Sequence, residues 1–547
     1  MHKRIYPLFS VICLVVFLLA ACDHSALETE PKIAIKPDSL VIENLSWISY
    51  GLTVTYNDVV LDTSEVYWES RNQGVATVDL RRGYVTGVGA GETEIVATLV
   101  NGLGFATCKV TVFQTNGYKY RLILKDKGTS GFSVARPEEF LSSKAIERRN
   151  KQNIPIDETD LPISTEYLKE IEQVGGVIVA KSKWLKTVTI HCSDEFLIDT
   201  YKALPFVEDV VMVWVGKRNA VPSSNLNAVR TSAKAVNNAT VIDSTYYGSA
   251  WNNINLHKGQ VLHELGYKGA GMDIAIIDEG FINLMNNPTL DNINIKGAKS
   301  FIYKNSDPYA TDSHGVWTLS CMATNKPGYY VGTAPEANYW LLRTEVVSSE
   351  YPVEEDYWVA AAEFADSVGV DVVNTSLSYF YHDGITFNYK WQDMDGNTAF
   401  ASRGANMAAA KGIFIVSSAG NHASWVGAPG DSPNVLAVGS VNKFGKIDDF
   451  SSYGMTVDGR MKPDVVALGE GVYVINTDGK LSFRSGTSYS SPIICGLAAC
   501  LWQAFPQLTN KELMNIIRKS ADKYDNPVLP YGYGIPDMQK AIQITQE

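Results

Sequence analysis

The sequence lacks the marks of several large protein classes. No internal apolar run reaches the ~18 residues that span a bilayer, which excludes a polytopic membrane protein. The 47 lysines and arginines are outnumbered by 59 acidic residues, giving a net charge of −12, so a sequence-independent nucleic-acid binder is not expected. Only 19% of residues are charged and 45% are hydrophobic, which argues against a mostly disordered chain. The 547 residues are enough for about three or four domains.

Cysteines are too few and too scattered for a disulfide framework. Of the 7, Cys13 and Cys22 lie in the first segment of the chain. The others are Cys108, Cys192, Cys321, Cys495 and Cys500. An odd number at wide spacing predicts small buried hydrophobic residues rather than bridges. The histidines and cysteines also lack a metal-ligand spacing, so no metal-binding residue is predicted.

Residues 1–21 have the pattern of an export signal. Lys3 and Arg4 precede an apolar stretch, residues 8–21, that is too short for a stable membrane span. It ends in Leu19-Ala20-Ala21-Cys22, which resembles a bacterial lipoprotein signal. The resemblance implies that Cys22 is acylated and that its acyl chains anchor the protein to a membrane. The alternative is an ordinary secretion signal followed by an unrelated cysteine.

The anchor implies a place in the cell envelope. We expect an outer-membrane lipoprotein, on a periplasmic or surface face that the sequence does not decide. The polar and acidic residues 22–32 are suited to a tether.

Residues 33–114 are expected to form an all-β domain, because short alternating stretches are separated by turn signals. The expected strands are 52–56, 66–69, 76–78, 84–88, 94–98 and 108–112. The runs Trp68-Glu69-Ser70 and Gly83-Tyr84-Val85-Thr86-Gly87 resemble the bacterial immunoglobulin-like domain of surface proteins. Such a domain is a spacer or an adhesive module, and the spacer is the simpler interpretation.

Residues 118–215 change to a mixed α+β pattern. Strands are expected at 120–125, 177–180, 187–191 and 207–214, and helices at 137–152, 167–174 and 196–203. Pro137 suits the first turn of its helix. Residues 216–250 have no clear periodicity and are interpreted as a linker.

Residues 251–547 follow an α/β pattern. Apolar strands at 273–277, 339–343, 371–375, 413–417 and 435–438 alternate with helical stretches such as 359–367 and 401–410. This alternation predicts a parallel sheet covered on both faces. Ligand sites in such sheets lie at the carboxyl ends of the strands.

The clearest chemical signal is Ser488, which lies beside the start of an apolar helix and follows Gly486. The helix dipole there favours an oxyanion, and glycine allows a substrate to approach. A serine needs a base and an orienting acid to become a nucleophile. His314 begins a helical stretch and Asp278 ends the first strand of this region. The order Asp, His, Ser is that of the subtilisin arrangement.

Residues 251–547 resemble the subtilisin-like serine peptidases, or subtilases, and more closely a lipoprotein branch from Bacteroidetes-type bacteria. The matching stretches are Ile274-Ala275-Ile276-Ile277-Asp278 with Gly280, His314-Gly315, Asn374-Thr375-Ser376-Leu377-Ser378, Ser418-Ala419-Gly420-Asn421, Phe450-Ser451-Ser452-Tyr453-Gly454, Lys462-Pro463-Asp464-Val465, Gly486-Thr487-Ser488 with Pro492, and Tyr531-Gly532-Tyr533-Gly534. The resemblance implies a three-layer parallel sheet of the subtilisin type.

The resemblance also assigns roles. Ser488 would attack the scissile carbonyl, His314 would take its proton, and Asp278 would hold the imidazole tautomer. Asn421 would donate its side-chain amide to the oxyanion. The segment Ser376-Leu377-Ser378 would line the groove and pair with the substrate backbone.

Three positions depart from the usual family pattern. Glu279 follows the catalytic aspartate in place of serine or threonine, and an extra carboxylate there either raises the histidine pKa or points to solvent. Tyr489-Ser490 and Val316-Trp317 replace the commoner Met-Ala and Thr-His. These departures bear on subsite shape and pH optimum more than on the triad.

An acidic stretch follows one of the expected strands: Glu345, Glu350, Glu354, Glu355 and Asp356. By its position it resembles the loop that borders the upstream substrate subsites. It suggests either a preference for basic residues on the amino side of the cut or a solvated acidic face.

The position of residues 118–215 ahead of a subtilase domain resembles that of a peptidase propeptide, which assists folding and blocks the cleft. The alternative is a permanent accessory domain without an inhibitory role. If maturation cleavage occurs, we expect it in residues 216–250.

The sequence therefore predicts a lipid-anchored serine endopeptidase that acts on proteins or peptides. Its chemistry requires no cofactor, and a monomer is expected. Subtilases often bind structural calcium through loop oxygens, but the sequence does not place such a site. One alternative is a catalytically idle subtilase fold that binds peptides or acts as an adhesive surface protein. Another is a structural protein whose peptidase only processes itself.

Overall fold

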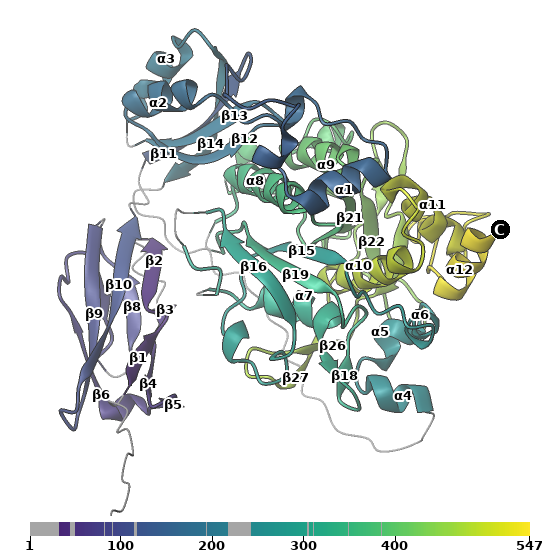
Figure 1. Cartoon of the computed structure of the whole chain (residues 1–547), viewed down its shortest axis with the longest axis horizontal. Helices are drawn as coiled ribbons and strands as arrows, with labels where there is room; N and C mark the ends of the chain where they lie inside the picture. Colours follow the sequence, from purple (N-terminus) through teal and green to yellow (C-terminus); the bar gives the residue numbers. More distant parts are fainter. Residues whose placement is uncertain are drawn as a thin grey trace, which may run out of the picture.

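The computed structural model describes residues 32–43, 50–80, 82–89, 91–113, 117–192, 194–216, 242–302, 306–309, 311–347, 349–383 and 385–547. They form a β-sandwich, an α+β domain and a large α/β domain (Figure 1). The expected signal peptide, the lipidation site Cys22, the tether and residues 217–241 of the expected linker lie outside the described residues, apart from Lys32. Within these ranges, no helix combines the length and apolar character needed to cross a membrane.

The first domain is all β, as expected. Its elements are β1 (Ile33–Lys36), β2 (Ser39–Glu43), β3 (Tyr50–Gly51), β4 (Thr53–Tyr56), β5 (Val59–Val60), η1 (Thr63–Glu65), β6 (Val66–Ser70), β7 (Ala76–Val78), β8 (Tyr84–Gly87), β9 (Gly91–Leu99) and β10 (Phe105–Phe113). They pair into sheets of order β1-β4-β5, β2-β10-β9-β6 and β3-β8-β7. Strand β6 alternates buried and exposed residues, which places Val66 and Trp68 in the core.

The second domain is α+β. Its elements are β11 (Gly117–Leu124), η2 (Pro137–Glu139), α1 (Ser143–Lys151), η3 (Glu158–Asp160), α2 (Thr165–Gln173), β12 (Val177–Ser182), β13 (Thr187–Cys192), α3 (Leu197–Lys202) and β14 (Val207–Gly216). The antiparallel sheet has the order β12-β13-β11-β14.

The single helix expected at 137–152 is wrong, because the structure divides this stretch. Pro137 begins the short 3-10 helix η2, and α1 starts only at Ser143. The Ser142 side chain caps α1 by accepting a hydrogen bond from the Ala145 amide at 3.2 Å.

The third domain is α/β. Its elements are α4 (Ile242–Tyr247), α5 (Trp251–Asn255), α6 (Gln260–Glu264), β15 (Asp273–Asp278), η4 (Leu284–Asn286), β16 (Asn294–Ser300), α7 (His314–Ala323), β17 (Asn325–Lys326), β18 (Tyr330–Val331), β19 (Asn338–Arg343), α8 (Val353–Val368), β20 (Val372–Thr375), η5 (Ile385–Phe387), η6 (Trp391–Asp393), α9 (Phe400–Ala410), β21 (Phe414–Ser418), β22 (Leu436–Val441), β23 (Gly454–Met455), β24 (Met461–Lys462), β25 (Val465–Leu468), β26 (Val472–Ile475), β27 (Leu481–Arg484), α10 (Thr487–Ala504), α11 (Asn510–Ser520) and α12 (Met538–Gln546). Because α4 begins at Ile242, residues 242–250 are structured although the sequence suggests a linker there.

A seven-stranded parallel sheet, of order β16-β19-β15-β20-β21-β22-β25, forms the centre of this domain. Apolar side chains of α7, α10, α11 and α12 pack on one face and those of α8 and α9 on the other. The expected three-layer parallel architecture is confirmed. Strands that are buried on both faces show continuous apolar runs, and every residue of β15 is buried.

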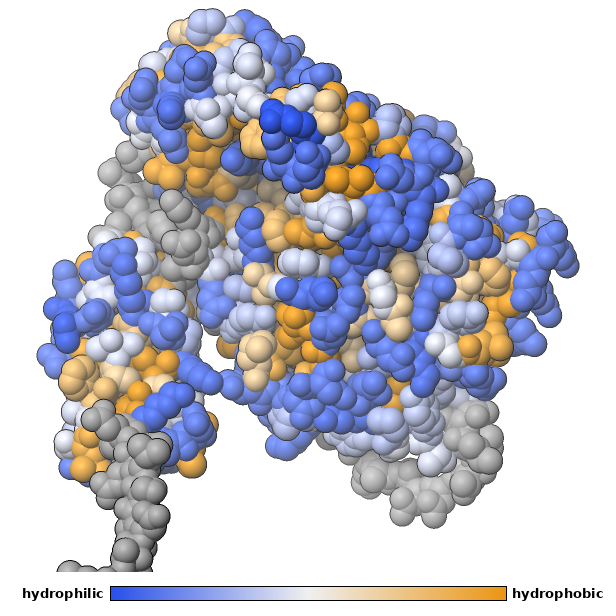
Figure 2. Space-filling view, in the orientation of Figure 1, coloured by the Kyte–Doolittle hydropathy of each residue, from blue (hydrophilic) through white to orange (hydrophobic). Residues whose placement is uncertain are grey.

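The five described cysteines are free and buried, as expected. Hydrophilic residues cover much of the face in Figure 2, and hydrophobic residues appear there in separate groups.

Candidate active site

Asp278 and His314 meet at the carboxyl edge of the parallel sheet. Asp278 is the last residue of β15 and is fully buried, and His314 is the first residue of α7. The imidazole Nδ1 donates to Asp278 Oδ1 at 2.7 Å. Thr318, one turn further along α7, donates its hydroxyl to Asp278 Oδ2 at 3.0 Å. Both oxygens of the carboxylate are therefore engaged, and its orientation is set.

Glycines let the two loops that carry these residues approach closely. A Cβ on Gly315 would lie 2.4 Å from the Gly280 carbonyl oxygen, and one on Gly280 would lie 2.1 Å from the Thr311 carbonyl oxygen. The Asp312 carboxylate accepts the His314 amide at 2.8 Å. These contacts explain why glycine follows His314 and why another lies two residues after Asp278.

The surrounding carboxylates change the acidity of His314. Burial alone would lower the pKa of this imidazole, but the charge of Asp278 and its hydrogen bond raise it, with further contributions from Glu279 and Asp312. The net effect is a pKa above the ordinary histidine value. Burial, together with Asp312 and Asp278, raises the pKa of Glu279, against an opposing effect of His314. Glu279 is therefore coupled to the histidine and is not a remote surface residue.

Ser488 lies in the first turn of α10, directly after Gly486 and Thr487. Gly486 has φ +154°, just inside the region that disfavours other residues. The Ser488 hydroxyl donates to the Ser376 carbonyl at 3.4 Å, and the Ser376 hydroxyl donates to the Ser488 carbonyl at 2.9 Å. The next residue, Tyr489, lies beside His314, with 6.1 Å between the centroids of the two rings. The start of α10 therefore lies beside the start of α7, although Ser488 and His314 share no hydrogen bond in this geometry.

Asn421 is held in a fixed orientation by the residue before Ser488. Its Oδ1 accepts both the backbone amide and the hydroxyl of Thr487, at 2.8 and 2.9 Å. The Thr487 hydroxyl also accepts the Gly420 amide at 3.1 Å. With Oδ1 anchored in this way, Nδ2 is the donor side of the amide. Sequence reasoning missed Thr487 and Thr318 as supports, although Thr318 lies at the i+4 position from His314 and Thr487 directly precedes Ser488.

The segment Ser376-Leu377-Ser378 follows strand β20, on the side of the sheet edge where Ser488 lies. Ser376 and Leu377 are 6% and 8% exposed. The Leu377 carbonyl accepts the Ser418 hydroxyl at 3.2 Å. The structure thus places all of the predicted site residues of this domain along one edge of the sheet.

The acidic stretch is not a solvated face. Glu345, Glu354, Glu355 and Asp356 are 5%, 1%, 0% and 3% exposed, and Glu350 is the exposed member. Glu354 accepts the backbone amides of Val346 and Tyr351. The preference for basic substrates stays a prediction, with only one exposed carboxylate of this stretch to support it.

Carboxylate oxygens of Glu345, Glu350 and Glu354 lie within 4.8 Å of one another. Glu345 already accepts the hydroxyls of Thr344 and Tyr379, at 2.6 and 2.7 Å. Backbone amides occupy both oxygens of Glu354, and hydroxyls occupy Oε1 of Glu345. A cluster of carboxylates alone is not a site, and we assign no metal to it.

Two further histidines, His257 and His263, lie in the core of the peptidase domain. Both are buried, and burial lowers the pKa of each to about 4. Their ring nitrogens contact the carbonyls of Pro536 and Thr333 at 3.0 and 3.1 Å. Both histidines are therefore core residues with a structural role.

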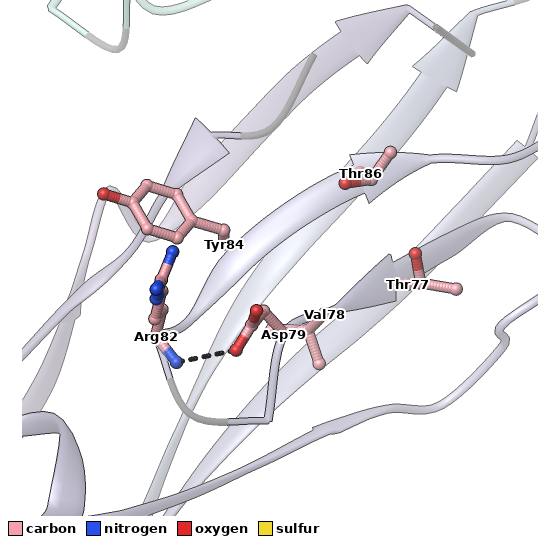
Figure 3. A pocket seen from close by; sticks show the side chains of 6 residues that line it. All are labelled: Thr77, Val78, Asp79, Arg82, Tyr84 and Thr86. Atoms are coloured by element: carbon pink, nitrogen blue, oxygen red, sulfur yellow. Dashed lines mark hydrogen bonds between the residues drawn. The ribbon is translucent and has the colours of Figure 1, made fainter. Parts of the chain in front are cut away.

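A separate pocket lies on the β-sandwich, on the sheet that contains β7 and β8 (Figure 3). Its volume is about 540 Å³, and Thr77, Val78, Asp79, Arg82, Tyr84 and Thr86 line it. The Arg82 amide donates to Asp79 at 2.9 Å, so this contact stabilises the turn itself. The side chain of Tyr84 is 44% exposed, and the pocket is open to solvent.

Three family models match the chain. They are the subtilase family over residues 269–535, the Bacteroidota peptidase S8 propeptide domain over residues 119–227, and the bacterial Ig-like domain (group 2) over residues 33–110.

Individual relatives match mainly the peptidase region. Subtilisin NAT from Bacillus subtilis subsp. natto is 28% identical over 293 residues, which cover 52% of this chain and 69% of that protein. A thermophilic serine proteinase from Bacillus sp. (strain AK1) is 29% identical over 344 residues, covering 60% of this chain and 78% of that protein. Subtilisin from Bacillus pumilus is 28% identical over 293 residues, covering 52% of this chain and 96% of that protein.

Fold, site and matches together define a serine-type endopeptidase. Residues 269–535 are a subtilase-family domain, which is preceded by a Bacteroidota-type propeptide domain and a bacterial immunoglobulin-like domain.

Proposed function

We propose that this chain hydrolyses peptide bonds through an acyl-enzyme formed on Ser488. The Ser488 oxygen attacks the scissile carbonyl while His314 takes its proton. His314 then gives that proton to the leaving amine as the peptide bond breaks. Water, deprotonated by the same imidazole, attacks the ester. The bond between the acyl carbon and the Ser488 oxygen then breaks, the imidazolium returns the proton to that oxygen, and the acid product leaves. Asp278 keeps Nδ1 protonated, so that Nε2 is free to act as the base.

Asn421 would stabilise the oxyanion together with the backbone amide of Ser488. The anchoring of its Oδ1 by Thr487 supports this role, because it leaves the amide nitrogen as the donor side. A preorganised donor does not have to be reoriented during the reaction. Ser376-Leu377-Ser378 would line the groove and pair with an extended substrate.

The observation that carries the proposal is the 2.7 Å hydrogen bond between the buried Asp278 and His314 at the start of α7. An idle fold that only binds peptides has no need for this pair beside Ser488 and Asn421. A fluorophosphonate probe tests the proposal, because it labels an activated serine. Labelling of the wild type but not of Ser488→Ala supports the enzyme, and no labelling in either favours the peptide-binding or adhesive alternative.

We also propose that Cys22 is lipidated and anchors the enzyme in the cell envelope, as an outer-membrane lipoprotein. The support is the Leu19-Ala20-Ala21-Cys22 sequence and the acidic tether that follows it. Incorporation of radioactive palmitate into the wild type, and its loss in Cys22→Ser, tests the anchor. Equal incorporation in both proteins would overturn it.

The proposed chemistry uses only groups of this chain and needs no cofactor. A calcium ion would act on stability alone, and we assign it no site. We expect the enzyme to act as a monomer on protein or peptide substrates.

A further inference from the structure

Trp317 lies beside the proposed base of the reaction. It belongs to α7, one turn after His314, and the two rings meet edge to face with 6.3 Å between their centroids. It is also one of the positions at which the sequence departs from the usual family pattern. The proposed mechanism gives Trp317 no role, although it is an immediate neighbour of the imidazole.

The hairpin of β26 and β27 holds this ring in place. The indole Nε1 of Trp317 donates to Asn476 Oδ1 at 3.0 Å. The Ile475 amide donates to the Ser320 hydroxyl of α7, also at 3.0 Å, which fixes the hairpin to the helix. The labels of α7, β26 and β27 lie close together in Figure 1. Because the indole nitrogen is bound and the hairpin is attached to α7, the orientation of the ring is set.

Arg484, the last residue of β27, lies over the Trp317 ring. The central carbon of its guanidinium is 4.1 Å from the ring centroid. Its Nη1 donates to the Ser482 hydroxyl at 2.8 Å and to the Phe483 carbonyl at 2.9 Å. Among the residues that the structure describes, no carboxylate forms an ion pair with Arg484. The guanidinium is therefore held in one place while its Nε and Nη2 are left for a ligand.

This arginine is close to the reacting groups. After Arg484 the chain runs through residues 485–487 to Ser488, and the next residue, Tyr489, lies beside His314. Burial raises the pKa of Tyr489, and the positive charge of Arg484 opposes this rise. Arg484 itself is half-buried, so part of its surface is open to an arriving substrate.

The position of Arg484 decides which part of a substrate it meets. In the proposed mechanism Asn421 binds the oxyanion, and His314 gives its proton to the leaving amine. Trp317 and Arg484 lie on the His314 side of Ser488. They therefore meet the residues on the carboxyl side of the cut, which leave together with that amine.

We propose that Arg484, oriented by Trp317, selects substrates that have Asp or Glu at one of the first two residues after the cut. A guanidinium binds a carboxylate through two parallel hydrogen bonds, and Nε and Nη2 lie on one edge of the group. Successive side chains of an extended peptide point to opposite faces, so only one of the two positions should meet Arg484. The inference rests on the proposed function and names the substrate class of the same site.

Fluorogenic peptides test this selection. They keep one sequence on the amino side of the cut and carry Glu, Gln or Lys at the first or the second residue after it. They are given to the form of the wild type that takes up the fluorophosphonate probe, and mass spectrometry of the products identifies the bond that is cut. At one of the two positions, kcat/KM for Glu should exceed that for Lys by about tenfold, with Gln between them. Equal values for Glu, Gln and Lys at both positions would overturn the proposal.

Charge reversal assigns the preference to Arg484. In Arg484→Glu the order of the peptides should reverse, and Arg484→Met should remove the preference while it keeps an apolar contact with Trp317. The control is Lys480→Glu in the same hairpin, an exposed lysine paired with Asp478, which should keep the wild-type order. A preference for Glu that persists in Arg484→Glu would refute the role of Arg484.

A substrate without residues after the cut separates selection from a general loss of activity. A peptidyl aminomethylcoumarin has no side chain in its leaving group, so Arg484→Met should change its kcat/KM by less than about twofold. A loss on this substrate as large as the loss on the Glu peptide would show that Arg484 supports the active site as a whole. That result would overturn its role in selection.

Binding to the Ser488→Ala variant keeps the inference separate from catalysis. Fluorescence anisotropy with singly labelled versions of the same peptides should show tighter binding of the Glu peptide than of the Lys peptide. If the wild type takes no fluorophosphonate while this difference in affinity is present, only the proposed function fails. If the wild type is labelled but cuts the Glu and Lys peptides equally well, only the selection by Arg484 fails.

Discussion

Glu279 and Asp312, two acidic residues on the loops that carry Asp278 and His314, both raise the pKa of the His314 imidazole. Each of the two residues is held beside the Asp278–His314 pair by a backbone contact: the Glu279 amide donates to Asp278 at 2.8 Å, and Asp312 accepts the His314 amide at 2.8 Å. Of the two outcomes considered for an acidic residue after Asp278, coupling to the histidine is the one that the structure favours.

This coupling predicts the pH dependence of the enzyme. His314 acts as a base only when it is neutral, and its raised pKa moves the acid limb of kcat/KM toward alkaline pH. Glu279→Gln removes one of the charges that raise this pKa, so the limb should move to lower pH by roughly 1 unit. Besides Glu279, Asp278 and Asp312 are the charged groups that act on the imidazole.

The measurement is kcat/KM against pH for a fluorogenic peptide. Asp291→Asn serves as a control, because Asp291 is an exposed carboxylate paired with Lys326 and should not move the limb. An unchanged limb in Glu279→Gln would show that the Glu279 charge does not reach the imidazole.

Asn421→Ala should lower kcat by about 100- to 1,000-fold with a much smaller change in KM, the effect known for the corresponding kind of donor in subtilisin. The physical reason is that its amide meets charge that develops only in the transition state. Thr487→Val, which removes one of the two anchors of Asn421 Oδ1, should give a weaker loss in the same direction. Steady-state kinetics on both variants checks that kcat falls more in Asn421→Ala than in Thr487→Val. A rise in KM with an unchanged kcat would point to a role in substrate binding instead.

The buried Glu345 predicts a pH-dependent stability. Burial raises its pKa to about 7, although hydrogen bonds from Thr344 and Tyr379 oppose the shift. A carboxyl that keeps its proton in the folded state, against an ordinary value of 4.5, stabilises below pH 4.5 and loses that contribution as pH rises toward 7.

Glu345→Gln has no carboxyl group to ionise, so the variant does not lose stability in this way as the pH rises. Its melting temperature relative to the wild type should be higher at pH 8 than at pH 5, as measured by differential scanning calorimetry. A difference between the two proteins that is the same at both pH values would mean that Glu345 ionises in the folded protein as it does in the unfolded chain.

Gly83 in the β-sandwich should tolerate no side chain. It has φ +67°, and a Cβ there would lie 2.5 Å from the ring of the buried Trp68. Gly83→Ala should destabilise the sandwich by about 2 kcal/mol or more, from left-handed strain and overpacking together. Gly102→Ala separates the two effects, because Gly102 has φ +74° with no atom within 4 Å of the added Cβ.

Thermal unfolding of both variants measures the difference. The Gly102 variant should show only the strain, about 1 kcal/mol. Equal losses of stability in Gly83→Ala and Gly102→Ala would mean that the Trp68 ring moves aside at no cost. Fluorophosphonate labelling of Ser488 should not change in either variant, because both glycines lie in the β-sandwich.

The sequence predicts the parallel sheet well, because strands buried on both faces are continuous apolar runs such as Ile274–Ile277. Two edge strands were not predicted. Strand β16 contains lysines and a glycine, and β25 begins at Val465, the last residue of a stretch that was noted for its family resemblance rather than for a strand pattern. The split between η2 and α1 was also missed, because charge and periodicity continue across Ser142 while the backbone does not.

The site residues could be predicted because each lies in a short motif at the end of a strand or the start of a helix. The contacts between domains could not. Arg121 and Asp356 are 235 residues apart, and nothing local to either residue indicates the other. Likewise, the buried acidic residues of α8 look like a solvated face until the propeptide domain covers part of them.

The central claim is that Ser488 is an activated nucleophile beside Asp278 and His314. It is tested most directly by intact-protein mass spectrometry after fluorophosphonate treatment of the wild type, Ser488→Ala and His314→Ala. We predict one added probe in the wild type, none in Ser488→Ala and a strongly reduced rate in His314→Ala. Labelling that persists in Ser488→Ala, or that is absent from the wild type, would contradict the claim.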